Sequence, residues 1–337
     1  MCSEDVTTRA QQRCAWVRSV VHNPAVDVRL ASMDAGARSY WRIFPPSAAY
    51  PFILMDVPAG EESLEQWLQV QALWHEKKIR VPQVVCADIA QGFALLEDLG
   101  TKTALDVINA ENADHWFALA IDQLVAIQQL HVPSHFAQFD DQVLQRDAHV
   151  FQEWFLERHL GVECDTADLS QLAHIHAILA ESIAAQPQGF VHRDFMLRNL
   201  MPLTDGALAV IDFQDCLRGP LGYDPMSLFR DTGVTWPRQR VLDWLKQYHA
   251  RALCAGIALP KYAQFLQDAE LSGIQRHLKV LGIFARLHYR DNKSRYLKEI
   301  PRIFAHLEDA LVHYPQLSAL HSILERHVRP KLHYIAS

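Results

Sequence analysis

The hydrophobic pattern of this sequence changes near Gly100, and the change limits the folds open to the chain. Before it, three short stretches rich in aromatic and β-branched residues end at proline or glycine, as β-strands commonly do. These stretches are 37–45, 50–58 and 92–100. Residues 61–79 instead repeat their apolar side chains at helical spacing, with acids at the front and lysines at the back. The N-terminal part therefore predicts a small sheet with one helix.

After Gly100, apolar side chains recur at helical spacing almost throughout, for example in 111–131 and 168–185. Nearly everything beyond residue 238 is also periodic. The sequence therefore predicts an α+β protein with two lobes. The expected lobes are a small, β-rich N-terminal lobe, residues 1–98, and a larger, mainly helical C-terminal lobe, residues 99–337.

Composition narrows the class of protein. Half of the 337 residues are hydrophobic and 21% are charged, which favours a folded chain with a substantial core. The formal charge is −7, from 32 basic and 39 acidic residues, so we expect no nucleic-acid partner. The same charge opposes an anionic substrate unless the site is locally basic.

Other sequence signals point to a cytoplasmic protein. No apolar run approaches the roughly 18 residues of a membrane helix, so we expect no membrane partner. The N-terminal segment MCSEDVTTRA lacks the apolar core of a signal peptide. None of the six cysteines forms a C-x-x-C pair, which favours reduced thiols over a zinc or redox site.

The chemistry is concentrated in two loops of the C-terminal part. The stretch FVHRDFMLRNLM, residues 190–201, carries Asp194 and, five positions later, Asn199. A second aspartate, Asp212, follows the short apolar stretch ALAVI, which reads as a strand. Phosphoryl transfer requires a carboxylate to accept the proton of the attacking hydroxyl and oxygen ligands to hold Mg²⁺. The pattern H-R-D-x-x-x-x-N followed by D-F supplies Asp194 as the base and Asn199 and Asp212 as magnesium ligands.

Each of these residues alone is more often a turn residue or a helix cap. Their order, the spacing within the first motif and the strand before the second favour the catalytic interpretation when they are taken together. His192 and Arg193 are interpreted as supports of the loop, and a surface charge is the alternative for Arg193.

These motifs identify a resemblance. The segments VHRDFMLRNLM and AVIDFQDCLRGPLGYDPMSL resemble the aminoglycoside phosphotransferase family, which has the protein-kinase-like fold. Within that family, the H-R-D form and the C-terminal segment RHLKVLGIFARLHYRDNKSRYL are most similar to the bacterial N-acetylmuramate/N-acetylglucosamine anomeric kinases of cell-wall sugar recycling. The similarity spans nearly the whole chain. It implies an ATP-dependent, Mg²⁺-requiring kinase of an amino-sugar hydroxyl.

The resemblance also implies roles for particular residues. The segment LLEDLG resembles the hinge between the lobes, so backbone groups of Glu97 and Leu99 are expected to contact adenine. Asp224 matches a late motif whose aspartate supports the catalytic loop, and we favour that role over substrate contact.

One departure concerns the nucleotide phosphates. Kinase-like folds usually hold them with a cation on the third strand, but that position falls on Met55, which carries no charge. Arg38 and Arg42 are the candidate substitutes, because alternation places both on one strand face; a solvated role is the alternative. The expected phosphate loop has the single glycine Gly36, and the helix acid that would pair with the missing lysine, Glu62 or Glu65, stays unassigned.

Two other functions remain open from the sequence. The first is phosphorylation of an aminoglycoside or another small molecule by the same machinery. The second is a kinase-like binding protein that has lost catalysis, which Met55 favours and the intact Asp194, Asn199 and Asp212 oppose. The sequence does not indicate the oligomeric state or a preference between ATP and GTP.

Overall fold

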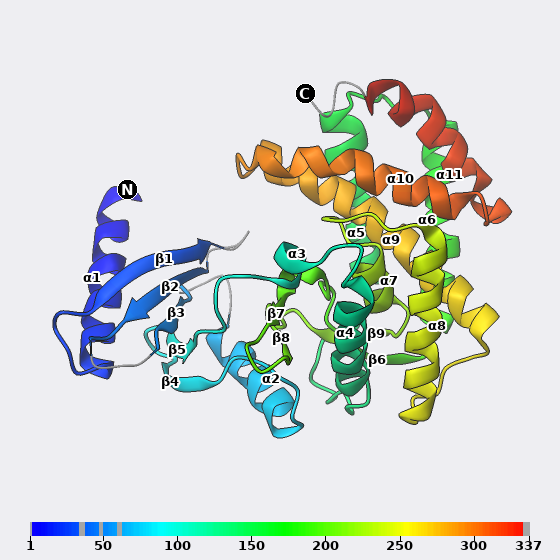
Figure 1. Ribbon diagram of the computed structural model, residues 1–337. Helices are drawn as coiled ribbons and strands as arrows, with labels where there is room; N and C mark the ends of the chain where they lie inside the picture. Colours follow the sequence, from blue (N-terminus) through cyan, green and yellow to red (C-terminus); the bar gives the residue numbers. More distant parts are fainter. Residues whose placement is uncertain (1, 34–37, 47–49, 59–62, 333–337) are drawn as a thin grey trace. The chain divides into compact units, whose positions relative to one another are not determined.

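The computed structural model describes residues 2–33, 38–46, 50–58 and 63–332 (Figure 1). It divides into two compact units, the first formed by Met1–Lys102 with Met201–Gln214 and the second by Thr103–Leu200 with Asp215–Ser337. The predicted N-terminal lobe, 1–98, lies within the first unit. The segment 201–214 was assigned by sequence to the C-terminal lobe, but its contacts group it with the first unit.

The first unit is a small antiparallel sheet with two helices. Its elements are α1 (Cys2–Val20), β1 (Asp27–Met33), β2 (Ser39–Phe44), β3 (Phe52–Asp56), α2 (Leu64–Glu76), β4 (Val84–Asp88), β5 (Phe93–Glu97) and the hairpin of β7 (Leu200–Pro202) with β8 (Leu208–Val210). The five-stranded sheet has the order β1-β2-β3-β5-β4. The three predicted strands and the predicted helix are confirmed, whereas α1, β1 and β4 were not predicted.

The second unit is mainly helical, which confirms the expected α+β class. Its elements are α3 (Ala104–Val107), α4 (Ala113–Gln128), α5 (Asp141–Val150), which continues as a π-helix (Phe151–His159), α6 (Thr166–Ala185), β6 (Gln188–Val191), β9 (Leu217–Pro220), α7 (Tyr223–Phe229), α8 (Arg238–Cys254), α9 (Tyr262–Tyr289), α10 (Ile300–Leu311) and α11 (Ser318–Ile323). Short 3-10 turns join several of these helices, including Leu197–Asn199 in the loop after β6.

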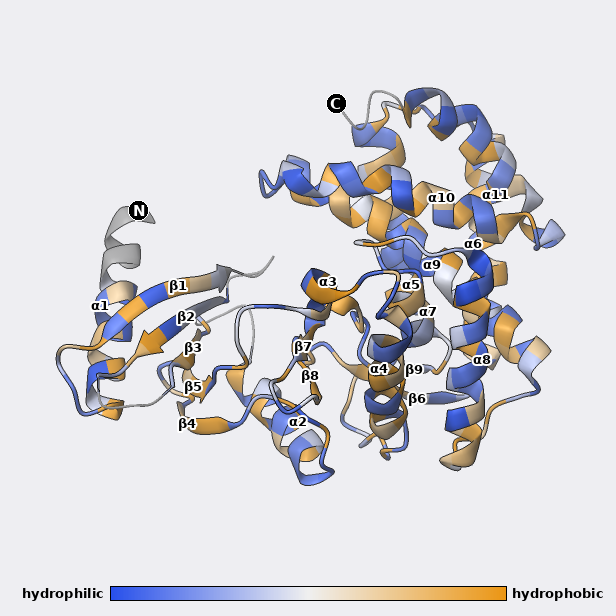
Figure 2. Cartoon of the chain, viewed as in Figure 1, coloured by the Kyte–Doolittle hydropathy of each residue, from blue (hydrophilic) through white to orange (hydrophobic). Residues whose placement is uncertain are grey.

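Helix α9 forms the centre of the second unit. All its residues from Ala269 to Gly282 are buried, and its apolar side chains join a core shared with α6, α10 and α11. A Cβ at Gly282 would lie 2.3 Å from the carbonyl oxygen of Val150, so only glycine permits this close backbone contact with the end of α5. Helix α10 is amphipathic, and hydrophilic and hydrophobic residues alternate along it (Figure 2). Within the described part of the chain, no helix is long and apolar enough to cross a membrane.

The sheet of the first unit has one face covered by α1. Trp16 and Val17 of the helix pack on Ile43, Leu54 and Phe93 of the strands. Pairing places Tyr40 opposite Met55 and Arg42 opposite Ile53, so these residues occupy the other face. The predicted alternation along β2 is therefore confirmed for the strand residues.

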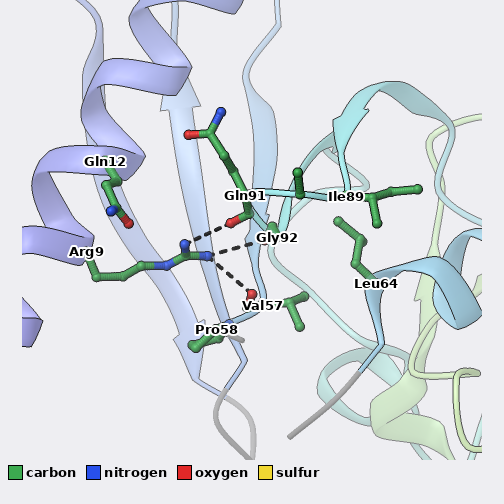
Figure 3. A pocket seen from close by; sticks show the side chains of 9 residues that line it. Arg9, Gln12, Val57, Pro58, Leu64, Ile89, Gln91 and Gly92 are labelled. Atoms are coloured by element: carbon green, nitrogen blue, oxygen red, sulfur yellow. Dashed lines mark hydrogen bonds between the residues drawn. The ribbon is translucent and has the colours of Figure 1, made fainter. Parts of the chain in front are cut away.

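A small hollow of about 240 Å³ lies beside α1, next to the turn between β4 and β5 (Figure 3). Arg9 reaches into it and donates hydrogen bonds to the carbonyl oxygens of Gln91 (2.8 Å) and Val57 (3.2 Å). Gly92 closes the turn with φ +72°, and a Cβ there would lie 2.1 Å from the Val57 oxygen. The side chain of Arg9 thus joins the helix to two separate backbone segments.

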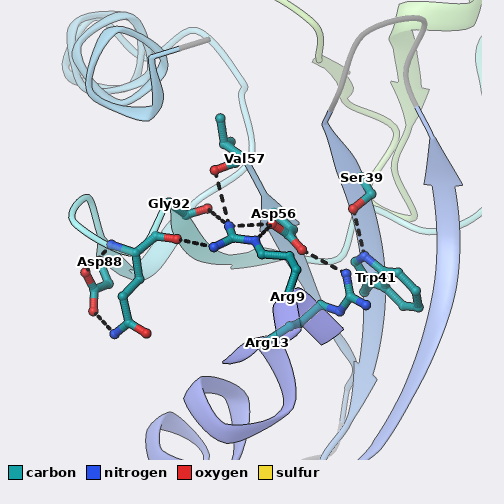
Figure 4. Close-up of polar contacts among 9 residues, drawn as sticks. Arg9, Arg13, Ser39, Trp41, Asp56, Val57, Asp88 and Gly92 are labelled. Atoms are coloured by element: carbon teal, nitrogen blue, oxygen red, sulfur yellow. Dashed lines mark hydrogen bonds and ion pairs between the residues drawn. The ribbon is translucent and has the colours of Figure 1, made fainter. Parts of the chain in front are cut away.

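The strongest polar link between α1 and the sheet is a pair of arginines on Asp56 (Figure 4). Arg9 lies 2.6 Å and Arg13 lies 2.8 Å from opposite oxygens of this carboxylate, which is 2% exposed. The Arg13 guanidinium also stacks 3.6 Å above the Trp41 ring. These contacts fix the end of β3, the strand that carries Met55.

We expect Asp56→Ala to lower the free energy of unfolding by roughly 2–4 kcal/mol, because it leaves two arginines without their shared carboxylate. Arg9 remains partly in water, which moderates the loss. Urea denaturation measures it. The matched control is Asp27→Ala, which breaks an exposed ion pair with Arg29 and should change stability by less than about 0.5 kcal/mol. Equal effects of the two variants would show that the arginine pair does not hold α1 to the sheet.

Candidate functional site

The predicted catalytic loop follows β6 in the second unit. Its backbone passes through a left-handed conformation at Arg193, with φ +75°, directly before Asp194. A residue with a side chain adopts this conformation at a cost, and such residues concentrate at functional sites. The carboxylate of Asp224 accepts hydrogen bonds from the backbone N–H groups of His192 (2.6 Å) and Arg193 (3.0 Å). The predicted role of Asp224 as a loop support is confirmed.

A second buried carboxylate holds the other end of the loop. Asp231 accepts hydrogen bonds from the backbone N–H groups of Leu197 (2.8 Å) and Gly233 (2.6 Å) and is fully buried. The side-chain amide of Asn199 donates to the carbonyl oxygen of Asp194, at 2.9 Å. Because the NH₂ group is directed to the loop backbone, the Asn199 carbonyl oxygen is directed away from that bond.

The electrostatic surroundings keep Asp194 ionised. Burial alone would raise its pKa, but Lys279 and Arg276 of α9 lower it, and so does Arg193. The alternative of a surface charge for Arg193 is wrong, because its side chain is partly buried and its Nε has no hydrogen-bond partner among the described residues. An ionised Asp194 is able to accept a hydrogen bond from a hydroxyl.

The predicted metal loop belongs to the first unit. Asp212 follows β8, has φ +64° and accepts a hydrogen bond from Gln214 Nε2 at 2.9 Å. Arg38 is 5% exposed, and its guanidinium lies 3.8 Å from the Asp212 carboxylate. The structure therefore brings together two of the predicted site residues, one from the sheet and one from the loop.

Helix α2 positions this loop. Phe213 is fully buried, with ring centroids 5.0 Å from Trp67 and 5.3 Å from Trp74. The backbone N–H of Val210 donates to the carbonyl oxygen of Arg80 at 2.8 Å, just after α2. These contacts explain why segment 201–214 groups with the first unit.

The donor types fit magnesium. Mg²⁺ prefers hard oxygen ligands, and it is usually held by one or two carboxylates with waters and substrate phosphates. Asp212 offers a carboxylate that is 33% exposed, and Asn199 offers an amide oxygen. Asp212 belongs to the first unit and Asn199 to the second.

Of the predicted hinge residues, Glu97 ends β5 and Leu99 follows it. The Glu97 carboxylate binds Arg80 at 2.5 Å, and its backbone N–H donates to Gln83, at 2.9 Å. Burial opposes a low pKa at Glu97, but Arg80 lowers it. Leu99 is partly buried. The side chain of Glu97 is thus committed to structure, which leaves backbone contact as the predicted role of both hinge residues.

Arg42 is engaged at the same place. It binds Asp98 at 2.5 Å and the carbonyl oxygen of Gly100 at 2.9 Å, and its hydrogen bond with Asp98 raises its pKa. Arg42 and Glu97 line one hollow of about 760 Å³, whose walls include Phe44 and Tyr50. The structure therefore brings Arg42 together with the hinge, and Arg38 with Asp212.

Met55 is fully buried between Tyr40 and Ala94 of the neighbouring strands. The strand position expected for a cation is thus part of the apolar packing of the sheet. The predicted phosphate-loop residue Gly36 and the candidate helix acid Glu62 lie outside the described residues. Glu65 is exposed in the first turn of α2.

Three residues near the loop were not predicted from the sequence: Asp231, Arg276 and Lys279. Asp231 gave no signal, because a single aspartate in a loop is common. Arg276 and Lys279 do have a signal in the sequence. They lie three positions apart on a helix whose middle section is buried in the structure, and charged side chains are rarely buried without a reason.

Comparisons with known proteins identify the family of the chain. Residues 27–266 match the profile of the phosphotransferase enzyme family. The chain is 38% identical to the N-acetylmuramate/N-acetylglucosamine kinase of Pseudomonas putida, covering 94% of this chain and 96% of that protein. It is 41% identical to the protein of the same name from Pseudomonas aeruginosa, covering 89% and 88%. The counterpart from Neisseria meningitidis is 37% identical, covering 92% and 93%.

Solved structures support the fold. The choline kinase LicA of Streptococcus pneumoniae superposes with a TM-score of 0.63 at 13% identity, covering 89% of this chain and 99% of that one. A microcompartment-associated aminopropanol kinase gives a TM-score of 0.62 at 17% identity, covering 91% and 98%. At these identities the likeness concerns the fold alone, and it confirms the predicted kinase-like architecture.

The contacts of Asp224 predict a pH dependence. Burial raises its pKa to about 6. Below that pH the protonated carboxyl loses its charge-assisted bonds to the catalytic loop, so kcat/KM for phosphoryl transfer should fall on the acid side with an apparent pKa near 6. Stability should change in the opposite sense. The raised pKa of Asp224 in the folded state contributes stability that is fully present at a pH below the pKa of an unfolded aspartate. This stability is lost as the pH rises through about 6.

Asp224→Asn should remove this acid limb and the matching slope in the free energy of unfolding. Asp231→Asn is the matched control. It also removes a buried carboxylate that binds the loop backbone, but it should lower activity with the acid limb intact, because Asp224 is still present. An unchanged limb in Asp224→Asn would assign the titration to another group.

Proposed function

The chain belongs to the phosphotransferase enzyme family, and from this premise we propose that it transfers the γ-phosphoryl group of ATP to an amino sugar. The proposed acceptors are N-acetylmuramate and N-acetylglucosamine, at the anomeric hydroxyl. The observation that carries the proposal is the 37–41% identity to kinases of that name over 88–96% of both chains. The enzyme is proposed to act in the cytoplasm, where ATP is available.

The residues of this chain suit that reaction. Asp194 is held by a loop whose backbone is fixed at both ends by buried carboxylates, and it is placed to orient the sugar hydroxyl and accept its proton. The nearby cations lower its pKa, so it is a weak base, which suits a loose transition state in which positioning matters more than proton abstraction. We assign the hinge backbone at Glu97 and Leu99 to adenine.

Asn199 and Asp212 are the proposed magnesium ligands, and the ion would neutralise charge on the phosphates of ATP. Arg38 is the proposed phosphate cation in place of a strand lysine, because it lies beside Asp212. The contacts of Arg42 with Asp98 and Gly100 favour a hinge support for this second arginine.

The aminoglycoside alternative receives no support from the acids that could bind a polycation. The acids of the helical region that could meet ammonium groups are Glu153, Glu157, Asp165 and Asp168. Glu153 pairs with Arg158, and Asp168 pairs with Arg326. Asp165 caps α6, and Glu157 accepts a hydrogen bond from Gln152. All four have structural partners, so they do not form a set of carboxylates prepared for ammonium groups.

An ADP-release assay with Mg²⁺-ATP tests the proposal. The acceptors are N-acetylmuramate, N-acetylglucosamine, glucose, kanamycin and choline, and turnover is expected with the two acetylated sugars. Asp194→Asn is the control. It keeps the side-chain shape but cannot accept the proton, so kcat should fall on the order of 10²–10⁴-fold. Turnover of kanamycin alone would establish the aminoglycoside alternative. No turnover of any acceptor would favour a binding protein.

The two strand arginines give a separate prediction. A charge-assisted contact contributes about 1.5–3 kcal/mol, so Arg38→Ala should lower kcat/KM for ATP by about ten- to a hundredfold at saturating sugar. Arg42→Ala should affect ATP kinetics less and stability more, because it breaks the partly buried ion pair with Asp98. Steady-state kinetics with varied ATP, together with thermal melting, separate the two effects. Normal ATP kinetics in both variants would show that neither arginine binds phosphate.

A further inference from the structure

Arg276 of α9 is a buried cation without a hydrogen-bond partner in the described part of the chain. It is 1% exposed, and none of its three guanidinium nitrogens makes a hydrogen bond within the described residues. An unpaired buried charge is strongly unfavourable, because the lost hydration is not replaced. A ligand that supplies the missing acceptors would relieve this cost.

Two other arginines of the second unit have carboxylate partners. Arg230, which is 5% exposed, is paired with Asp309, and the partly buried Arg238 binds Glu270 at 2.6 Å. Arg276 differs from both, because none of its three guanidinium nitrogens has a hydrogen-bond partner among the described residues. It lies on the helix that carries the core of the unit.

The position of α9 relates this cation to the catalytic loop. Lys279, three residues farther along the same helix, donates to the hydroxyl of Tyr223 at 3.4 Å. Tyr223 directly precedes Asp224, whose carboxylate holds the backbone of the catalytic loop. Both cations also lower the pKa of Asp194, which agrees with their placement near that carboxylate.

Two carboxylates of the unit, Asp147 and Asp224, are bound to other groups, and Asp194, whose pKa Arg276 lowers, is the proposed base. Asp147 accepts a hydrogen bond from Gln275 at 3.0 Å. The Asp224 carboxylate binds the two backbone N–H groups of the loop. Neither carboxylate makes a hydrogen bond to Arg276. A planar guanidinium with its donors available matches a carboxylate in the fork geometry, which a lysine cannot reproduce.

We infer that Arg276, assisted by Lys279, binds the carboxylate of an anionic acceptor sugar and so distinguishes N-acetylmuramate from N-acetylglucosamine. The inference rests on the proposed function. The two sugars differ by the lactyl ether of N-acetylmuramate, which carries a carboxylate. A chain with a net charge of −7 needs local cations to accept such a substrate. The ATP phosphates already have a proposed cation, Arg38, beside Asp212 in the first unit.

Steady-state kinetics of Arg276→Gln with each sugar test the inference. Loss of a charge-assisted contact should lower kcat/KM for N-acetylmuramate about ten- to a hundredfold more than that for N-acetylglucosamine, because the effect of the variant on Asp194 is common to both sugars. Measurable activity with N-acetylglucosamine is the internal proof of folding. An equal loss with both sugars, or no loss with either, would overturn the inference, the first by indicating a structural or phosphate-binding role.

Two further variants complete the design. Arg286→Gln makes the same change in the same helix, at a partly buried arginine that is not among the charges that act most strongly on Asp194, and the ratio of the two sugars should stay at the wild-type value. Arg276→Lys keeps the charge but loses the fork, so its loss should be smaller and confined to N-acetylmuramate. If Arg276→Gln does not fold, Arg276→Lys decides: an unchanged ratio of the two sugars would then overturn the inference.

A binding measurement separates this inference from the proposed function. Calorimetric titration of Asp194→Asn with N-acetylmuramate needs no turnover. Binding that weakens at least tenfold in the double variant with Arg276→Gln supports the inference, even if the wild-type protein phosphorylates neither sugar. Binding unaffected by Arg276→Gln, or absent from Asp194→Asn, would overturn it, whatever the kinetic assay shows.

Discussion

The site depends on one interaction: the Asp224 carboxylate holds the backbone N–H groups of His192 and Arg193. Arg193 occupies a left-handed conformation, which an isolated chain would leave. Two charge-assisted hydrogen bonds offset that cost, and the turn they hold directs Asp194. Asp224 lies in the first turn of α7, and α7 packs on α9. The geometry of Asp194, the proposed base, is therefore set by the core of the helical unit.

A balance of charges follows from this arrangement. The ionised Asp224 is unfavourable in the core, as its raised pKa shows. The cations of α9 act in the opposite direction on Asp194 and keep it charged. The pKa values of the two aspartates therefore shift in opposite directions. Asp224 serves as a structural acceptor, and Asp194 is the proposed base. Environment, rather than residue type, separates their roles.

The sequence predicted the parts of the fold that have strong local signals. The strands around Met55, the amphipathic α2 and the long helices followed from periodicity alone. Helix α1 was not predicted, because its apolar residues are few and its attachment depends on Arg9 and Arg13 meeting Asp56, far away in the chain. The catalytic spacing could be read directly, whereas the partner of a buried cation such as Arg276 is a property of tertiary structure.

The presence of Met55 where kinase-like folds usually carry a lysine has a physical explanation. Met55 is fully buried in the packing of the sheet, so a lysine there would need a partner carboxylate to be tolerated. Asp56, the nearest acid in sequence, faces α1 and is occupied by two arginines. A cation placed instead at Arg38 sits beside Asp212 and needs no additional acid. The arginine pair on Asp56 and the proposed phosphate cation Arg38 are thus both compatible with a β3 strand that carries no cation at Met55.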